Sequence, residues 1–163
     1  GEVSDGLLVH GFTTEEYLRT VTLPALERGF AKSGKRREDF EICYPVFSIT
    51  GRDEAEMKTA ETKMRRQIAF YGSTPAYKGV LDSIGAGELQ PELNAMSKQG
   101  RWEEMGDLID DSVLDKFAIR GEPAELAATI KTRYGDLVDR SAAAYSDMDQ
   151  DEKLAFINAM RQG

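Results

Sequence analysis

Hydrophobic residues recur along the chain in two patterns, as short continuous runs and as longer segments with helical spacing. The runs at residues 7–9 and 41–49 are apolar at almost every position, which is typical of parallel strands covered on both faces. Pro45 is unusual in such a run, because prolines avoid central strands. Residues 15–31 and 54–71 carry apolar side chains every three or four positions, which indicates amphipathic helices.

The first predicted helix has a recognisable start and an interruption. Thr13 and Glu16 have the spacing of a capping box, in which two side chains accept hydrogen bonds from free amides of the first turn. Pro24 predicts a kink or a restart, because it has no backbone N–H to donate. Gly34 predicts the end of this helix.

Residues 73–116 show no strand pattern and read as several short helices, so we expect a helical insertion there. Regular order then returns, with a predicted strand at 117–121 and a helix that ends at Tyr134. A last strand is predicted at 137–143, and an amphipathic helix follows it.

The order of these elements indicates the α/β class, with three to four parallel strands joined by right-handed crossovers. So few strands leave an open sheet, and a closed eight-stranded β/α barrel takes about 250 residues. We therefore predict that residues 1–163 form the C-terminal part of a TIM-type barrel, with a helical insertion at about 73–116.

Composition excludes several classes of function. A net charge of −8 argues against a nucleic-acid partner, and no apolar stretch approaches the length of a membrane span. Cys43 is the only cysteine and lies in an apolar run, which suits a buried thiol in a reducing cytoplasm. Because His10 is the only histidine, we expect no metal site.

The turn at residues 10–14 is the first candidate site. It follows a predicted strand and precedes a helix N-terminus, the position where barrel active sites lie and where anions are favoured. His10 offers a hydrogen bond or a proton, Gly11 allows a ligand to approach the backbone, and Thr13 offers a hydroxyl. The simpler interpretation is a helix cap beside a solvent-facing histidine.

Lys98, Arg101 and Trp102 form the second candidate site, inside the helical insertion. Cations beside an aromatic ring suit an anionic or planar ligand, which we expect to be a small-molecule substrate. The alternative is that Trp102 packs the insertion while Lys98 and Arg101 face water.

Five segments in order resemble the bacterial luciferase-like monooxygenase superfamily, and in particular its branch that uses the deazaflavin coenzyme F420. The segments are 1–10 (GEVSDGLLVH), 23–29 (LPALERG), 66–77 (RQIAFYGSTPAY), 97–102 (SKQGRW) and 121–123 (GEP). One departure is the predicted last strand, because residues 141–145 are less apolar than in relatives.

The resemblance implies an eight-fold β/α barrel and hydride transfer between the deazaflavin and a small organic substrate. It implies that His10, Gly11 and Thr13 lie near the cofactor tail or the substrate, and that Lys98 and Arg101 flank the substrate pocket. It also implies that the chain matches only the C-terminal half, so we expect a fragment that is inactive alone.

Two other functions stay open, an FMN-dependent monooxygenase of the same superfamily and a small non-catalytic module that binds anions. The FMN enzyme differs from the deazaflavin enzyme in its visible absorbance, and the binding module differs from both in the behaviour of the open sheet. An isolated module folds as a stable monomer, whereas a partial barrel forms a homo-oligomer or self-associates through its unpaired strand edges.

Overall fold

A computed structural model describes residues 1–144 and 146–162. Tyr145, in the segment 141–145 that departs from relatives, and Gly163 lie outside the described residues. The described strands form one sheet, and each of their pairings is parallel, which confirms the predicted α/β class. These strands are β1 (Gly6–Leu8), β2 (Glu41–Ile49), β3 (Ala118–Arg120) and β4 (Arg140–Ala144).

β1 and β3 share one edge of β2. The N–H of Val9 donates to the carbonyl of Cys43, and the N–H of Gly121 donates to the carbonyl of Ile49. Alternate residues of a strand direct their backbone groups to the same edge, and Cys43 and Ile49 are six residues apart, so both carbonyls point to one edge of β2. β1 therefore lies beside the start of this edge and β3 beside its end. Pro45 falls between the two, facing the gap. Its missing N–H therefore costs no hydrogen bond between strands, which explains a proline in a central strand.

β4 occupies the opposite edge of β2. The N–H of Asp139 donates to the carbonyl of Ile42 at 2.9 Å, and the pairing then runs from Cys43↔Arg140 to Phe47↔Ala144. β4 thus pairs with β2 and not with β3, which precedes it in the sequence. A closed barrel places each strand beside its sequence neighbours, so this is an open arrangement of barrel-type strands.

The predicted start of the last strand is corrected from residue 137 to Arg140. The N–H groups of Leu137 and Val138 both donate to the carbonyl of Tyr134, which holds these residues in the turn that ends the preceding helix. Leu137 is 3% exposed, so its apolar character reflects burial in that turn and not membership of the strand.

The first predicted helix consists of three segments: α1 (Glu15–Tyr17), the π-helical turn η1 (Leu18–Thr22) and α2 (Leu23–Ser33). Its N-cap is Thr14, whose Oγ1 accepts the N–H of Tyr17 at 3.1 Å, so the predicted capping box at Thr13 is wrong by one residue. The restart at Pro24 is confirmed, because Pro24 lies in the first turn of α2 directly after the π turn. Gly34 ends α2 with φ of 74°, as predicted.

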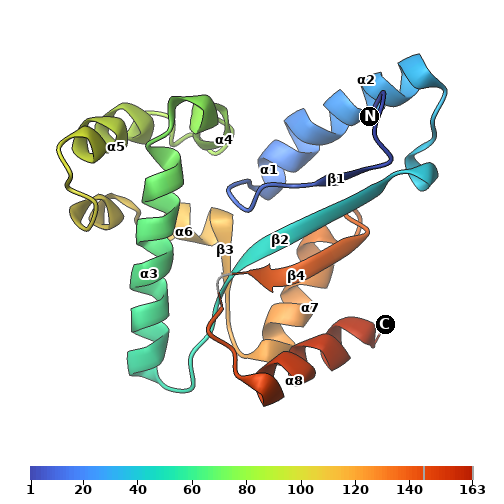
Figure 1. Ribbon diagram of the computed structural model, residues 1–163. Coiled ribbons are helices and arrows are strands. Elements are labelled where there is room, and N and C mark those ends of the chain that lie inside the picture. The colour runs from blue at the N-terminus through green and yellow to red at the C-terminus, as the bar shows by residue number, and fades with distance from the viewer. Residues whose placement is uncertain (145, 163) are drawn as a thin grey trace.

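The other helices lie on two sides of the sheet (Figure 1). α3 stands to one side, with α4 and α5 gathered at its C-terminal end, while α7 and α8 pack together on the other side. Their bounds are η2 (Arg37–Asp39), α3 (Glu54–Gly72), η3 (Pro75–Tyr77), α4 (Lys78–Asp82), α5 (Leu89–Lys98), η4 (Glu104–Leu108), α6 (Asp111–Phe117), α7 (Pro123–Tyr134) and α8 (Gln150–Arg161).

β2 contributes to two hydrophobic cores. Its residues Ile42, Tyr44 and Val46 are buried with residues of α2, α7 and α8. Phe47 and Ile49 are buried instead with α3 and the short helices that follow it. The face that carries Cys43 and Pro45 is less covered near the start of β2, and Leu8, paired with Cys43, is 73% exposed.

Candidate functional site

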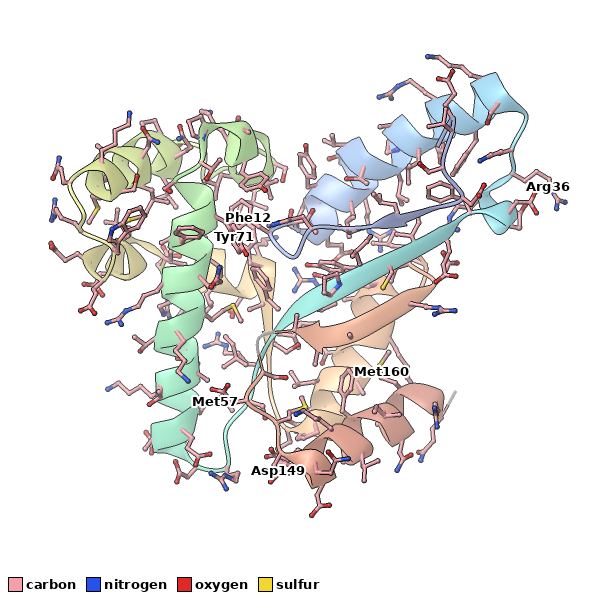
Figure 2. The ribbon with its side chains drawn as sticks, viewed as in Figure 1. Phe12, Arg36, Met57, Tyr71, Asp149 and Met160 are labelled. Carbon is pink, nitrogen blue, oxygen red and sulfur yellow. The ribbon has the colours of Figure 1, made fainter. Side chains whose placement is uncertain are left out.

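His10 lies directly beyond the carboxyl end of β1, where the chain turns toward α1. Val9 is still hydrogen-bonded to β2, so the backbone is anchored up to the residue before His10. The His10 side chain is exposed, whereas Phe12 two residues later is 2% exposed and lies close to Tyr71 of α3 (Figure 2). The turn therefore presents His10 from a well-packed support.

Two tyrosines and one backbone amide hold the His10 ring. Its centroid lies 4.8 Å from that of Tyr71, edge to face at 89°, and 5.2 Å from that of Tyr77, stacked at 28°. The N–H of Phe12 donates to His10 Nδ1 at 3.0 Å. Both ring contacts are geometries that aromatic pairs favour.

A pocket of ≈390 Å³ opens beside His10. It lies where the end of β1 meets the middle of β2, because Pro45 lines it together with Leu8 and the residues that follow β1. Its lining is mostly apolar, with the imidazole as a polar group: Leu8, Val9, His10, Gly11, Pro45 and Tyr71. This size and character suit part of a planar organic ligand.

Gly11 and Thr13 have structural reasons for their identities. A Cβ on Gly11 would lie 2.5 Å from Cε1 of Phe47, so the glycine lets this turn pack on the sheet. Thr13 is 4% exposed, and its Oγ1 is buried with no hydrogen-bond partner among the described residues. That both bind a cofactor stays a prediction.

A buried tyrosine supports the same turn from below. The hydroxyl of Tyr44 donates to the carbonyl of Thr13 at 3.4 Å. Burial raises the pKa of Tyr44 well above its ordinary value, so this phenol keeps its proton and its role as a donor.

The structure places the second candidate site at the C-terminal end of α5 and the residues that follow it. Lys98 ends α5 and is exposed, and Arg101 forms an ion pair with Glu104 at 2.6 Å on the surface. Trp102 is 49% exposed and packs its ring 5.9 Å from that of Phe70. These three residues are not among those that line the His10 pocket, and their part in substrate binding stays a prediction.

Sequence reasoning missed the residues that surround His10. Helical spacing assigned Tyr71 to the buried face of its helix without naming a partner, and Tyr77 received no role. The sequence contained only a weak signal for a contact with His10. Both tyrosines lie close to the C-terminal end of α3, and nothing else distinguishes them from other aromatic residues.

A second pocket, of ≈450 Å³, lies where the first turns of α3 and α8 meet. Asp53 caps α3 by accepting the N–H of Glu56, and Asp149 caps α8 by accepting the amides of Asp151 and Glu152. Because these helix ends are already capped and the lining carries more carboxylates than cations, the pocket disfavours an anion.

In the described part of the chain, no group of three or more His, Cys, Asp or Glu is arranged to hold a metal ion. None of the helices within residues 1–144 and 146–162 combines the length and the apolar character needed to cross a bilayer.

Residues 1–140 match the family described as luciferase-like monooxygenase, which is most of the chain. The chain belongs to the luciferase-like monooxygenase family. This is an oxidoreductase family, so the predicted resemblance is confirmed at that level. The match stops at the first residue of β4, so the rest of β4 and all of α8 lie beyond it.

Relatives of this luciferase-like chain fall into two groups. An uncharacterized protein of Mycobacterium tuberculosis is 49% identical over 140 residues, which are 86% of this chain and 41% of that protein. The 5,10-methylenetetrahydromethanopterin reductase of Archaeoglobus fulgidus is 26% identical over 79% of this chain and 39% of its own length. The chain therefore spans about two fifths of the length of the curated relatives that it matches.

A solved structure shares the fold. The coenzyme F420-dependent tetrahydromethanopterin reductase from Methanopyrus kandleri superposes with a TM-score of 0.71 at 18% identity. The alignment covers 96% of this chain and 44% of that one. This luciferase-like chain thus has an α/β fold with a parallel sheet, similar to the TIM-barrel-type fold of that enzyme, as predicted.

Proposed function

We propose that this chain forms part of an oxidoreductase that transfers a hydride between the deazaflavin coenzyme F420 and a small organic substrate. The observation that carries the proposal is the His10 pocket at the carboxyl end of β1, in a chain of the luciferase-like family. Relatives named as methylenetetrahydromethanopterin reductases support the same kind of chemistry.

The residues of the pocket fit the ring system of such a coenzyme. Leu8, Pro45 and Tyr71 offer apolar surface to a planar ring, and His10 offers a hydrogen bond to a polar atom at its rim. When bound, the deazaflavin supplies the carbon that accepts or gives the hydride. The protein residues bind and orient the ring and keep water from its apolar face.

The anionic tail of the coenzyme needs a separate support. Gly11 and Thr13 are our proposed contacts for it, through the backbone of the turn and the Thr13 hydroxyl. Thr13 Oγ1 is buried without a partner in the described part of the chain, so it has a free hydrogen-bonding position. Reaching it requires a small shift of the turn, because Thr13 is 4% exposed.

An FMN-dependent monooxygenase is the second candidate, favoured by the description of the matching family. The apolar pocket suits either ring system. The two functions differ in which coenzyme the protein selects, so binding distinguishes them.

The test is a fluorescence titration of the protein with coenzyme F420 and, separately, with FMN. We expect saturable binding of the deazaflavin, weakened about 3- to 10-fold by His10→Ala, the loss of one hydrogen bond. Arg36→Ala is the control, because Arg36 pairs with Asp39 far from Tyr71 (Figure 2). No saturable binding of the deazaflavin, or equal binding by His10→Ala, contradicts the proposal, and preference for FMN supports the second candidate.

Four further proposals accompany this function. The chain alone binds the coenzyme but does not turn it over, because strands that complete the site are needed. It acts on a small molecule, with no nucleic-acid or membrane partner, and works in the cytoplasm. Lys98, Arg101 and Trp102 contact the substrate. Copies of the chain associate through the unpaired edges of β1 and β4.

A further inference from the structure

The hydrogen bond between the Phe12 amide and His10 defines where the imidazole carries its proton. The Phe12 N–H donates to Nδ1 at 3.0 Å, and a nitrogen that accepts a hydrogen bond must present a lone pair. A neutral imidazole has one protonated nitrogen. With Nδ1 as the acceptor, the proton resides on Nε2.

The donor of that hydrogen bond is itself held in place. The Phe12 ring is 2% exposed and stacks on Phe117 at 4.5 Å and 23°. The next amide, of Thr13, donates to the carbonyl of Gly11 at 2.9 Å. The turn therefore keeps the Phe12 N–H in a fixed position at the Nδ1 edge of the imidazole.

The orientation of the ring is fixed independently of the hydrogen bond. Tyr77 stacks along one face of His10, and Tyr71 meets the ring edge to face. Together these contacts restrict rotation of the ring about χ2, which would exchange Nδ1 for a carbon at the Phe12 amide.

The pocket beside His10 makes an N–H donor valuable. Pro45 contributes a lining surface without a backbone N–H, and Leu8 and Val9 contribute apolar surface. A ligand oxygen in such surroundings is stabilised by a single well-placed donor, and leaving it unpaired is costly.

We propose that His10 acts as a fixed Nε2–H donor to an acceptor atom of the ligand, with Nδ1 held as the acceptor of the Phe12 amide. The Phe12 amide, Tyr71 and Tyr77 are the positioning groups that hold it in this form. The ligand class that follows is a planar molecule with a carbonyl or carboxylate oxygen at its rim. This inference rests on the proposed function for the identity of the ligand, but the state of the imidazole is a property of the free protein.

The experiment uses the fact that His10 is the only histidine of the chain, so ¹⁵N-labelled histidine gives one unambiguous set of imidazole signals. In mildly alkaline solution, without ligand, we expect Nε2 to resonate as a protonated nitrogen and Nδ1 as an unprotonated one. An imidazole that carries its proton on Nδ1, or that averages both forms as a free histidine does, overturns the inference.

Two variants test the positioning by the tyrosine. Tyr77→Leu removes the stacking ring and is expected to shift both nitrogen signals toward the averaged values of free histidine. Tyr77→Phe keeps the ring and is the matched control, with signals like those of the wild type. If Tyr77→Leu leaves the signals unchanged while the protein stays folded by circular dichroism, Tyr77 is not a positioning residue.

Adding coenzyme F420 to the same labelled sample separates this inference from the proposed function. A change of the Nε2 signal on binding, with its proton retained, supports both. Absence of binding with the Nε2–H form present contradicts the proposed function and leaves the donor assignment supported. Binding to a protein whose His10 is protonated on Nδ1 supports the function and overturns the inference.

Discussion

Gly11 is the residue at which the candidate site and the core touch each other. A methyl group here would meet the ring of Phe47, which is fully buried in β2. The residue therefore sets how closely the site can approach the sheet.

We expect Gly11→Ala to destabilise the protein by about 1–3 kcal/mol, because extra atoms in a packed core force side chains or backbone to move. Urea unfolding measures this effect. Gly79→Ala is the matched control. Its Cβ would lie 3.7 Å from the Tyr17 ring, an ordinary contact, and alanine favours the helix there. Equal stabilities of the two variants would contradict this account of Gly11.

Glu56 is the residue whose titration has the clearest cause. Its carboxylate accepts the backbone N–H, Nε and Nη2 of Arg52, and these bonds lower the pKa of Glu56 from 4.5 to about 2. Since the pKa is lower in the folded protein, the interaction stabilises it fully above pH 4.5 and is lost as the pH falls toward 2.

Thermal melting of Glu56→Gln beside the wild type tests this expectation. The wild type should melt at the higher temperature above pH 4.5, and the difference should close as the pH approaches 2. Glu54→Gln, on the same helical turn, is the control for removing a carboxylate there. A difference for Glu56→Gln that does not depend on pH would show that its carboxylate is not held by Arg52.

The residues of the candidate site were predictable from the sequence only in part. His10 was found because a short apolar run ends beside it and a helix start follows it, and both are local signals. Its partners Tyr71 and Tyr77 are some sixty residues away in the sequence. Helical spacing indicates that a residue is buried, but it does not indicate which residue it packs against. For the same reason nothing in the sequence indicated that Gly11 packs on the ring of Phe47, while its predicted contact with a ligand stays a prediction.

At the scale of elements, the start of β4 depends on one side chain. The carboxylate of Asp139 accepts the N–H of Ile42 at 2.7 Å and Nη2 of Arg37 at 3.0 Å. Burial alone would raise the pKa of Asp139, but these two donors hold it below its ordinary value. The side chain thus continues the pairing between β4 and β2 by one residue.

Asp139→Ala should destabilise the protein by about 1–3 kcal/mol, because it leaves the partly buried Ile42 N–H without an acceptor. Amide hydrogen exchange should quicken along β4 more than along β1. Asp136→Ala, which removes a surface partner of Arg19, is the control and should change stability little. Unchanged exchange in β4 would mean that Asp139 does not hold this strand.

Helices and strands differed in how far the sequence specified them. The long apolar patterns predicted β2 and α3. Pro24 predicted the restart of the first helix, because proline lacks a backbone N–H whatever its neighbours are. The π turn before it was not foreseen, because the spacing of apolar residues does not distinguish a π turn from an α-helical one. The first turn begins at Thr14 because its hydroxyl, and not that of Thr13, reaches the Tyr17 amide.

At the scale of the whole molecule, the sheet has unpaired outer edges, and the face that carries Cys43 and Pro45 is open near the start of β2. β1, β3 and β4 each pair only with β2 among the described strands. Leu8 is 73% exposed on the open face. Apolar surface beside free strand edges favours association between copies.

We expect Leu8→Glu to lower self-association without unfolding the protein, because a charge on this face opposes its burial. Sedimentation velocity over a range of protein concentrations measures the effect. Val21→Glu is the control, a 42% exposed apolar residue of η1 away from the sheet. An equal effect of both substitutions would indicate nonspecific association.

The class of the fold was predictable, but the neighbours of β4 were not. Alternation of strands and helices indicates parallel strands whatever their order. The order depends on which edge of β2 is available to β4. The side chains of residues 140–144 are small or polar, so their hydrophobic pattern does not indicate one edge over the other.

Since β2 pairs with every other strand, the sheet also has a fixed order of assembly during synthesis. β1 precedes β2 on the chain, so this pair can form early, whereas β4, the partner of the opposite edge, is added only after α7. While the helices between β2 and β4 are being synthesised, the apolar strand β2 has one edge without a partner strand. During that interval the bare edge of β2 is a place where another strand can pair wrongly, as unpaired strand edges in partly folded chains do.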